Sequence, residues 1–281
     1  MSTVNRRILP GFHASLGFAL LYLIVLVLIP LSACFIKTFS LTFGEFWAAV
    51  STERAQAAYL LTFGTSFAAA TISSVLGLIV AWVLVRYEFP GKRLFDAIID
   101  LPFALPTAVA GLVYVSLYYN KGWFGQFLFP LGIELAYTRA AIVWVLTFLS
   151  LPFIVRTVQP VLETFEIEQE EAAASLGANR FQTVTRVVLP TLVPALITGF
   201  ALAFARCLGE YGSVVFVAAN MPFKTEIAPM LIVGKLEGST YEDGGSGYAE
   251  ATALASVLLV ISFSMLIVIN LLQHWSRRHE S

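Results

Sequence analysis

The sequence predicts an all-α, polytopic membrane protein in which six transmembrane helices form one bundle. Three observations carry this prediction: the chain of 281 residues is 58% hydrophobic, only 12% of its residues are charged, and its apolar residues gather in long runs. A soluble domain has about twice that charged fraction, and about 20 apolar residues are enough to cross a bilayer. No soluble domain fits between the runs, so we expect a single transmembrane domain over residues 1–281.

Six apolar runs are the expected spans. The first follows Arg6 and Arg7 without an evident cleavage site, so we expect an uncleaved helix. The second is the longest and must tilt or protrude, and its many small residues allow helices to pack closely. The fourth is short and bounded by Arg139 and Arg156, whose long side chains can reach the interfaces. In chain order the spans cover residues 14–36, 57–85, 101–119, 140–155, 192–219 and 249–272.

The third span opens with two prolines, Pro102 and Pro106. Each proline removes a backbone donor and frees a carbonyl one turn back. We therefore expect a kinked or broken helix, which is tolerated at membrane depth where it packs in protein or lines a cavity. Pro102 alone is equally compatible with a plain helix start. Free amides beside Thr107 would suit an oxyanion.

The fifth span contains two charged residues, Arg206 and Glu210, one helical turn apart. Opposite charges at i and i+4 meet on one helix face, so the pair can simply neutralise itself. Alternatively, Arg206 faces a translocation pathway and attracts an anion, because an Arg at the bilayer centre costs about 2.5–3.5 kcal/mol on the insertion scale. Both interpretations can hold together. The candidate pathway or gate residues are Pro102, Pro106, Thr107, Arg206, Glu210 and Ser213.

Six spans place both termini on one side of the membrane. The basic residues then divide ten to six between the two faces, and the richer face is cytoplasmic. Both termini and the loop between spans four and five are thus expected inside, and the Gly-rich segment 242–247 outside, where we expect it to be flexible. The inner ten are Arg6, Arg7, Arg86, Lys92, Arg93, Arg156, Arg180, Arg186, Arg277 and Arg278. The outer six are Lys37, Arg54, Lys121, Arg139, Lys224 and Lys235.

The loop between spans four and five, residues 160–190, is a polar and helix-forming island. Its alanines at 172–174 favour a helix, and Glu170 and Glu171 suit the N-terminal end of that helix. Gly177 can take the left-handed conformation that ends a helix, and a second short helix is expected after it. One interpretation is an interfacial amphipathic loop, which is common in membrane proteins.

The spacing within this loop is more specific than its composition. Glu-Ala-Ala at 171–173, Gly177, and Val-x-Leu-Pro at 187–190 together resemble the EAA loop of ABC importer permeases, with Val187 where Ile is usual. In that family the loop forms the coupling helix, which inserts into a groove of an ATP-hydrolysing subunit. The resemblance implies the bundle of a type I ABC importer permease. The residues to which it assigns ATPase coupling are Glu171, Ala172, Ala173, Leu176, Gly177 and Arg180.

Three further segments narrow the resemblance. Residues 101–112, 152–163 and 208–212 are similar to the T-type permease subunit of sulfate/thiosulfate ABC transporters, and the likeness runs from about Pro10 to the C-terminal helix. The paired W-type subunit differs in the first, proline-rich segment. One departure is the outer loop 238–247, which is longer and richer in glycine than is usual in the family.

The resemblance implies an importer of sulfate or thiosulfate in a bacterial-type plasma (inner) membrane, working by alternating access. The partners it implies are a dimer of ATP-binding subunits, a second, W-type permease subunit, an extracytoplasmic sulfate/thiosulfate-binding protein and membrane lipid. The net charge of −1 gives no case for nucleic acid. Gly91-Lys92 and Gly234-Lys235 lack the rest of a phosphate-binding loop. We therefore expect no cofactor in this chain, with ATP and Mg bound by the partner ATPase.

Three alternatives stand beside this interpretation. Molybdate or tungstate is the nearest rival substrate, because each is also a tetrahedral dianion, but the T-type segments and the six spans argue against it. An intramembrane serine protease needs a base beside its serine, and the three histidines, His13, His274 and His279, all lie near the chain ends. A stand-alone channel or carrier would give the EAA loop no purpose. We therefore expect a transporter subunit and not an enzyme.

Neither Cys34 nor Cys207 has metal-ligand spacing.

Overall fold

The computed structural model describes residues 12–239 and 246–278, and every regular element within these ranges is a helix. The Gly-rich segment 242–247, predicted to be flexible, falls largely outside the described residues. In chain order the elements are α1 (Phe12–Leu23), η1 (Ile24–Leu28), α2 (Ile29–Thr38), α3 (Phe43–Val50), α4 (Glu53–Arg86), α5 (Lys92–Ile99), α6 (Leu101–Ala104), α7 (Thr107–Tyr118), α8 (Gly125–Leu128), η2 (Phe129–Leu131), α9 (Arg139–Glu163), α10 (Ile167–Ser175), α11 (Arg180–Thr183), η3 (Val184–Val188), α12 (Leu189–Leu208), α13 (Val214–Ala218), α14 (Ala228–Ser239) and α15 (Ser246–Arg278).

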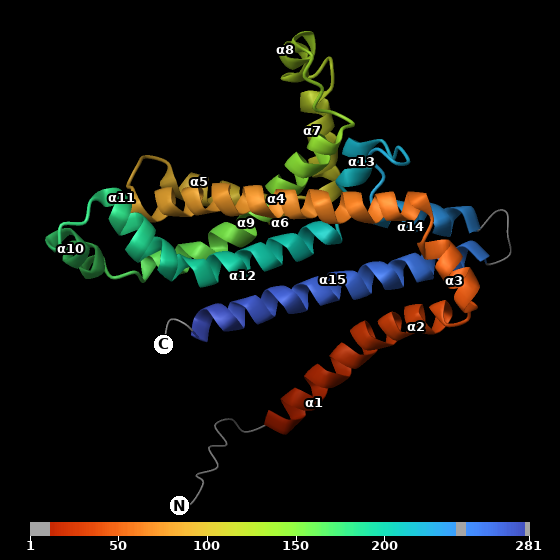
Figure 1. Ribbon diagram of the computed structural model, residues 1–281. Coiled ribbons are helices and arrows are strands. Elements are labelled where there is room, and N and C mark those ends of the chain that lie inside the picture. The colour runs from red at the N-terminus through yellow and green to blue at the C-terminus, as the bar shows by residue number, and fades with distance from the viewer. Residues whose placement is uncertain (1–11, 240–245, 279–281) are drawn as a thin grey trace, which may run out of the picture.

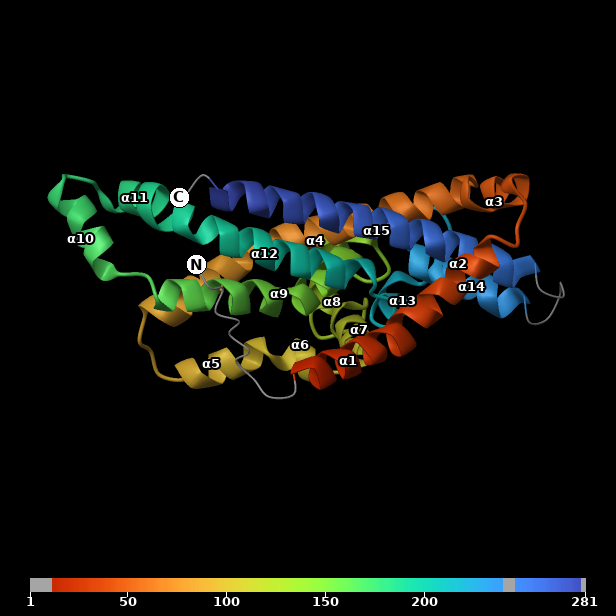
Figure 2. The same ribbon diagram turned by 90° about the horizontal axis from the view of Figure 1, so that it is seen from below.

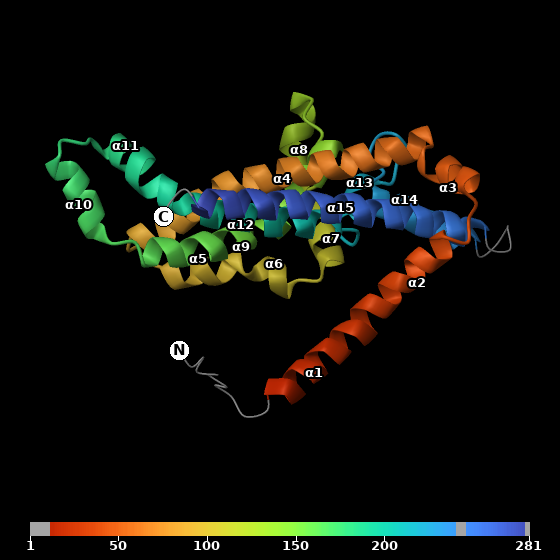
Figure 3. The same ribbon diagram turned by 60° about the horizontal axis from the view of Figure 1, so that its bottom comes forward.

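Four long helices, α4, α9, α12 and α15, run side by side along the length of the molecule (Figures 1 and 2). α10 and α11 lie at one end of this bundle, and α3 and α14 lie at the other (Figure 1). We call these the α10 end and the α3 end. α2 packs on α15, whereas α1 leads away from the bundle, as Figure 3 shows. The apolar side chains of α1 are therefore left exposed on all sides.

Five helices within the described residues are long and apolar enough to cross a membrane, and α7 adds a shorter apolar helix. This agrees with the prediction of an all-α bundle with six apolar segments. The five are Ala14–Thr38, Glu53–Arg86, Arg139–Glu163, Arg180–Leu208 and Gly247–Leu271.

The predicted break in the third span is confirmed. α6 ends at Ala104, Leu105 and Pro106 are extended, and α7 begins at Thr107. After the break the chain turns so sharply that α7 stands across the long axis of the bundle, with α8 at its far end (Figure 1). The expected single span 101–119 is therefore two helices that point in different directions, because Pro106 cannot continue the α6 hydrogen-bond ladder.

The helix that contains the fifth expected span, 192–219, has different bounds from that span. The helix begins earlier, at Arg180, and runs through the π-helical turn η3 into α12 without a break. It ends at Leu208, with Gly209 as its C-cap. The chain turns there because the Glu210 carboxylate accepts hydrogen bonds from the backbone N and the Oγ of Ser213, at 2.8 and 2.9 Å.

The core of the bundle lies where α4, α9 and α12 meet. Small residues let the helix backbones approach closely, as their frequency in the second span predicts. Ser73 Oγ on α4 lies 2.7 Å from Ser150 Oγ on α9, and Gly77 packs against Ile154, which is fully buried. Phe204 of α12 is also fully buried in this core.

Gly77→Ala should destabilise the bundle. A Cβ at position 77 would lie 2.7 Å from the Ile154 Cβ, and overpacking of this kind costs about 1–3 kcal/mol. The matched control is Gly64→Ala on the same helix, where an added Cβ meets nothing within 4 Å. Thermal unfolding of the two variants in detergent should show a lower midpoint for Gly77→Ala and an equal or higher midpoint for Gly64→Ala. Equal midpoints in both variants would contradict the packing argument.

Candidate functional site

The loop between α9 and α12 has the predicted helix–glycine–helix form. α10 ends at Ser175, and Gly177 has a φ of +86°, the left-handed conformation that glycine adopts at little cost. A reciprocal capping box then starts α11: Asn179 and Gln182 each accept a 2.9 Å hydrogen bond from the backbone N of the other. We call α10 and α11 with the turn between them, residues 167–183, the coupling segment.

The coupling segment exposes an apolar surface at the α10 end. Leu176 is 90% exposed, Phe181 is 77% exposed and Ile167 is 59% exposed. Large apolar side chains grouped at a polar end of a protein are typical of an interaction surface. Of the six residues assigned to coupling by the sequence, Ala173 is half-buried. The five that are exposed are Glu171, Ala172, Leu176, Gly177 and Arg180.

The two neighbouring glutamates of α10 lie in different environments. Glu171 is exposed, whereas Glu170 turns toward the bundle and accepts a hydrogen bond from Arg86 at the last residue of α4. From the sequence alone, both glutamates were expected to favour the N-terminal end of the helix, and Arg86 was only one of the basic residues on the inner face. No local pattern could have found this pair, because 84 residues separate its members.

Four of the predicted pathway residues meet where α7 begins. Glu210 accepts a hydrogen bond from Arg206 Nη1 at 2.5 Å and is itself 3% exposed. Ser213, which donates to Glu210, is fully buried, and its carbonyl lies against Gly111 of α7. Gly212 lies against the Thr107 Oγ1 at the start of α7. The broken third span and the end of the fifth helix therefore form one cluster.

The charge in this cluster is unevenly exposed. The Glu210 side chain is buried, but the Arg206 side chain is 32% exposed. In the described part of the chain, Glu210 is the acceptor found for Arg206. The geometry therefore fits both roles expected for the pair. The Glu210 carboxylate neutralises the Arg206 guanidinium, and the other N–H donors of Arg206 stay accessible to an anion.

The two prolines occupy different places. Pro106 forms the N-cap of α7, directly before Thr107 in the cluster. Pro102 is buried in the single turn of α6, which packs on α9, where Phe103 meets Phe153 edge-on with ring centroids 5.1 Å apart. Pro102 therefore helps to hold α6 on α9, and the helix break belongs to Pro106.

Arg156 has a larger role than the sequence analysis gave it. It was expected only to reach the membrane interface, yet its guanidinium makes five hydrogen bonds of 2.7–2.9 Å, among them a bidentate pair with Asp100. The other acceptors are the carboxylate and carbonyl of Asp96 and the amide oxygen of Gln159. Arg156 thus ties α5 and α6 to α9. The available sequence signal was the i, i+4 spacing of Asp96 and Asp100.

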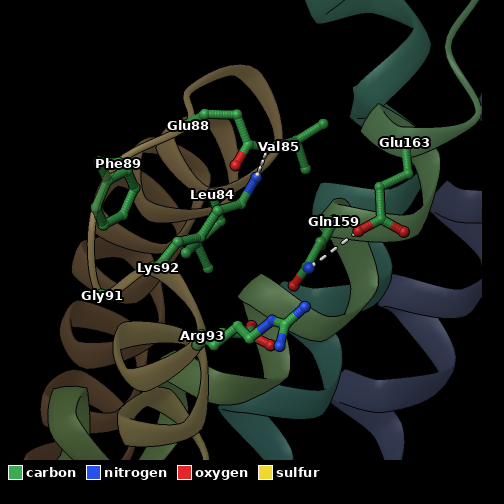
Figure 4. A pocket seen from close by; sticks show the side chains of 10 residues that line it. Leu84, Val85, Glu88, Phe89, Gly91, Lys92, Arg93, Gln159 and Glu163 are labelled. Carbon is green, nitrogen blue, oxygen red and sulfur yellow. Dashed lines mark hydrogen bonds and ion pairs between the residues drawn. The ribbon is translucent and has the colours of Figure 1, made fainter.

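A pocket of 580 Å³ opens beside this tie, between the end of α4, α5 and the end of α9 (Figure 4). Lys92 Nζ donates to Glu88 at 2.7 Å, and Gln159 Nε2 donates to Glu163 at 3.0 Å. Three acids and two bases line it, so it lacks the uniform sign that would select an ion. Over the described residues, no group of three or more His, Cys, Asp or Glu side chains could hold a metal.

Comparison with known proteins places the chain among membrane transport components. Residues 73–279 match the family described as "Binding-protein-dependent transport system inner membrane component". A relative named "Sulfate transport system permease protein CysT" from Synechococcus elongatus is 50% identical over 262 residues, 93% of this chain and 92% of the relative. A protein of the same name from Escherichia coli is 45% identical over 269 residues, 96% of this chain and 95% of the relative.

Solved structures of ABC transporters share the fold. A crystal structure of a bacterial transporter that imports the acidic polysaccharide alginate aligns with a TM-score of 0.75 at 16% identity, covering 95% of this chain and 94% of that chain. An inward-facing methionine ABC transporter aligns with a TM-score of 0.57 at 18% identity, covering 84% and 99% of the two chains.

Arg156→Lys should loosen α5 and α6 from α9, because lysine keeps the charge but not the planar fork that binds Asp100 at two points. Losing hydrogen bonds to charged groups costs about 1.5–3 kcal/mol each, and about 1.4 kcal/mol corresponds to a tenfold change in an opening equilibrium. Hydrogen exchange over residues 92–104 should therefore accelerate by at least about tenfold. Arg93→Lys, at an exposed position on α5, is the control and should leave exchange unchanged. Unchanged exchange in Arg156→Lys would contradict the role of Arg156 in holding α5 and α6 on α9.

Proposed function

The chain belongs to the family of inner membrane components of binding-protein-dependent transport systems, and from this premise we propose that it is the permease subunit of an ATP-driven ABC importer for sulfate. It is a multi-pass membrane protein, and its curated relatives are permease subunits. We include thiosulfate as a second substrate, since it is a tetrahedral dianion of similar size. Molybdate or tungstate is the alternative, and the uptake measurement below separates them.

The observation that carries the proposal is the exposed coupling segment. A short helix pair at one end of a membrane bundle, with α11 capped by Asn179 and with Leu176 and Phe181 exposed, suits insertion into a groove of another subunit. We assign that groove to a dimer of ATPase subunits, which bind ATP and Mg. A second permease subunit of the W type and an extracytoplasmic sulfate/thiosulfate-binding protein complete the complex.

Transport follows from a two-state bundle. Movement of the ATPase subunits displaces the coupling segment, and the helices attached to it change between inward-open and outward-open packing. On the substrate side, Arg206 offers accessible N–H donors beside the N-terminus of α7, and both favour an anion. Glu210 holds Arg206 in place and keeps the site from binding the dianion too tightly to release it. Thr107 and Ser213 supply hydroxyls at the same point.

Gly177→Asp should abolish co-purification of the ATPase subunit with this chain. The position has a φ of +86°, so a side chain strains the turn, and the added charge falls in the docking surface. The matched control is Gly132→Asp, since Gly132 also has a positive φ, +75°, and lies away from the coupling segment. It should retain the ATPase. Retention of the ATPase by Gly177→Asp would contradict the docking role. If both variants lost the ATPase, backbone strain alone would explain the result.

Arg206→Ala and Glu210→Ala should each lower uptake of labelled sulfate by at least about tenfold in cells that depend on this subunit, while the ATPase still co-purifies. Arg206→Ala removes the donors proposed for the anion, and Glu210→Ala removes the carboxylate that positions Arg206. Lys235→Ala and Glu250→Ala are the controls, because they break an exposed ion pair of 2.8 Å, which should matter little. Uptake of labelled thiosulfate and molybdate is measured in parallel. Normal sulfate uptake in both pathway variants would rule out the pathway role. If the wild-type subunit supported uptake of molybdate but not of sulfate, molybdate would be the substrate.

A further inference from the structure

One ion pair joins α10 of the coupling segment to α4 of the bundle, and α10 also lies against η3. Arg86 Nη2, at the end of α4, donates to Glu170 Oε1 on α10. Among the described residues, no other ion pair or side-chain hydrogen bond joins α10 to a transmembrane helix, and α10 has no buried residue. Arg86 and Glu170 are therefore the polar contact through which motion of α10 can reach α4 directly.

The geometry around Arg86 holds this contact firmly. Its guanidinium carbon lies 5.3 Å from the ring centroid of Trp82 and 5.8 Å from that of Phe165, so two aromatic faces flank the charge. The Arg86 and Glu170 side chains are 18% and 29% exposed, which makes the pair less screened than a surface ion pair. The buried Arg86 Nε finds no acceptor among the described residues. An unsatisfied buried donor raises the free energy of this arrangement and so eases a move to another one.

The opposite end of α4 carries a matching contact. Arg54, in the first turn of α4, forms a bidentate ion pair of two 2.6 Å hydrogen bonds with Glu226. The Glu226 side chain is only 2% exposed and belongs to the loop 219–227 between α13 and α14. A second bond joins α4 to the first residue of α14, directly after this loop: the backbone N of Ala228 donates to Thr62 Oγ1 at 2.8 Å.

α4 is built to carry motion between these two contacts. It has 34 residues and no proline, so it is about 50 Å long at 1.5 Å per residue. Its neighbours contain internal prolines, Pro152 and Pro160 in α9 and Pro194 in α12, and prolines are where helices bend. The loop 219–227 follows α13, whose N-cap is Ser213 of the pathway cluster.

We propose that α4 is the transmission element of this permease, with Arg86–Glu170 as its input contact and Arg54–Glu226 as its output contact. Displacement of α10 pulls or pushes α4 along its axis through Arg86, and Arg54 passes that shift to the loop beside the pathway cluster. All four are positioning residues, since they act through α4 and do not contact the substrate. The inference rests on the proposed function, because it requires an ATPase that moves α10.

The experiment measures sulfate imported per ATP hydrolysed by the complete complex in liposomes, with receptor present. Arg86→Gln and Glu170→Gln should each lower this ratio about tenfold, within the range typical of coupling between sites, while the ATPase still co-purifies. The matched controls are Lys92→Gln and Glu88→Gln, an ion pair of 2.7 Å at the same end of the molecule, and they should keep the wild-type ratio.

Two further variants separate transmission from simple structural support. The charge swap Arg86→Glu with Glu170→Arg should restore most of the ratio, because it rebuilds the contact in reverse. Arg54→Gln should lower the ratio as Arg86→Gln does, although it lies at the other end of α4. The readout is a ratio, so a variant that merely reduces the amount of folded complex leaves it unchanged.

Several outcomes would overturn the inference. A wild-type ratio in Glu170→Gln would do so, and because Glu170 is half-buried at the end of the bundle and outside its core, this variant should fold even if Arg86→Gln does not. A charge swap as defective as the single variants would also do so, as would loss of ATPase co-purification in Glu170→Gln, which would place Glu170 in the docking surface. Failure of the wild-type chain to retain any ATPase would instead overturn the proposed function, and the inference with it.

Discussion

Close packing of α4, α9 and α12 is the constraint on which the rest of the structure depends. In a bilayer the hydrophobic effect does not drive helices together, because lipid tails are as apolar as the side chains. Membrane helices therefore associate through close contact of small residues and through polar bonds between helices. Gly77 against Ile154 and Ser73 against Ser150 provide both kinds of contact at the centre of this bundle. With the three helices packed together there, their ends place charges at defined positions, and α6 of the broken third span packs on α9.

The sequence predicted what is local and missed what is distant. The helix–glycine–helix form of residues 167–183 and the break before Thr107 follow from signals within a few residues, and both are confirmed. The partners of Arg86 and Arg54 lie 84 and 172 residues away, where no periodicity can indicate them. The end of α12 at Leu208 was missed because the chain stays apolar beyond it, so hydropathy cannot register a turn made by the Glu210 side chain.

The coupling segment is attached to α12 and to α4 by two routes of different kinds. Through α11 and η3 it is part of the same uninterrupted helix as α12, which ends next to Glu210. Through Glu170 it holds α4 by a charge contact. The covalent route moves with the segment in every state, whereas the charge contact can be made or broken, so the two helices can respond differently to one displacement.

The exposed leucine and phenylalanine of the coupling segment also have a consequence for the assembly of such a subunit in the cell. A chain synthesised without its companions would present Leu176 and Phe181 to water with nothing over them, and exposed apolar groups of this kind invite aggregation and recognition by chaperones and proteases. Orphan copies would therefore be cleared, and the cell would accumulate this protein only in step with the subunit that covers it.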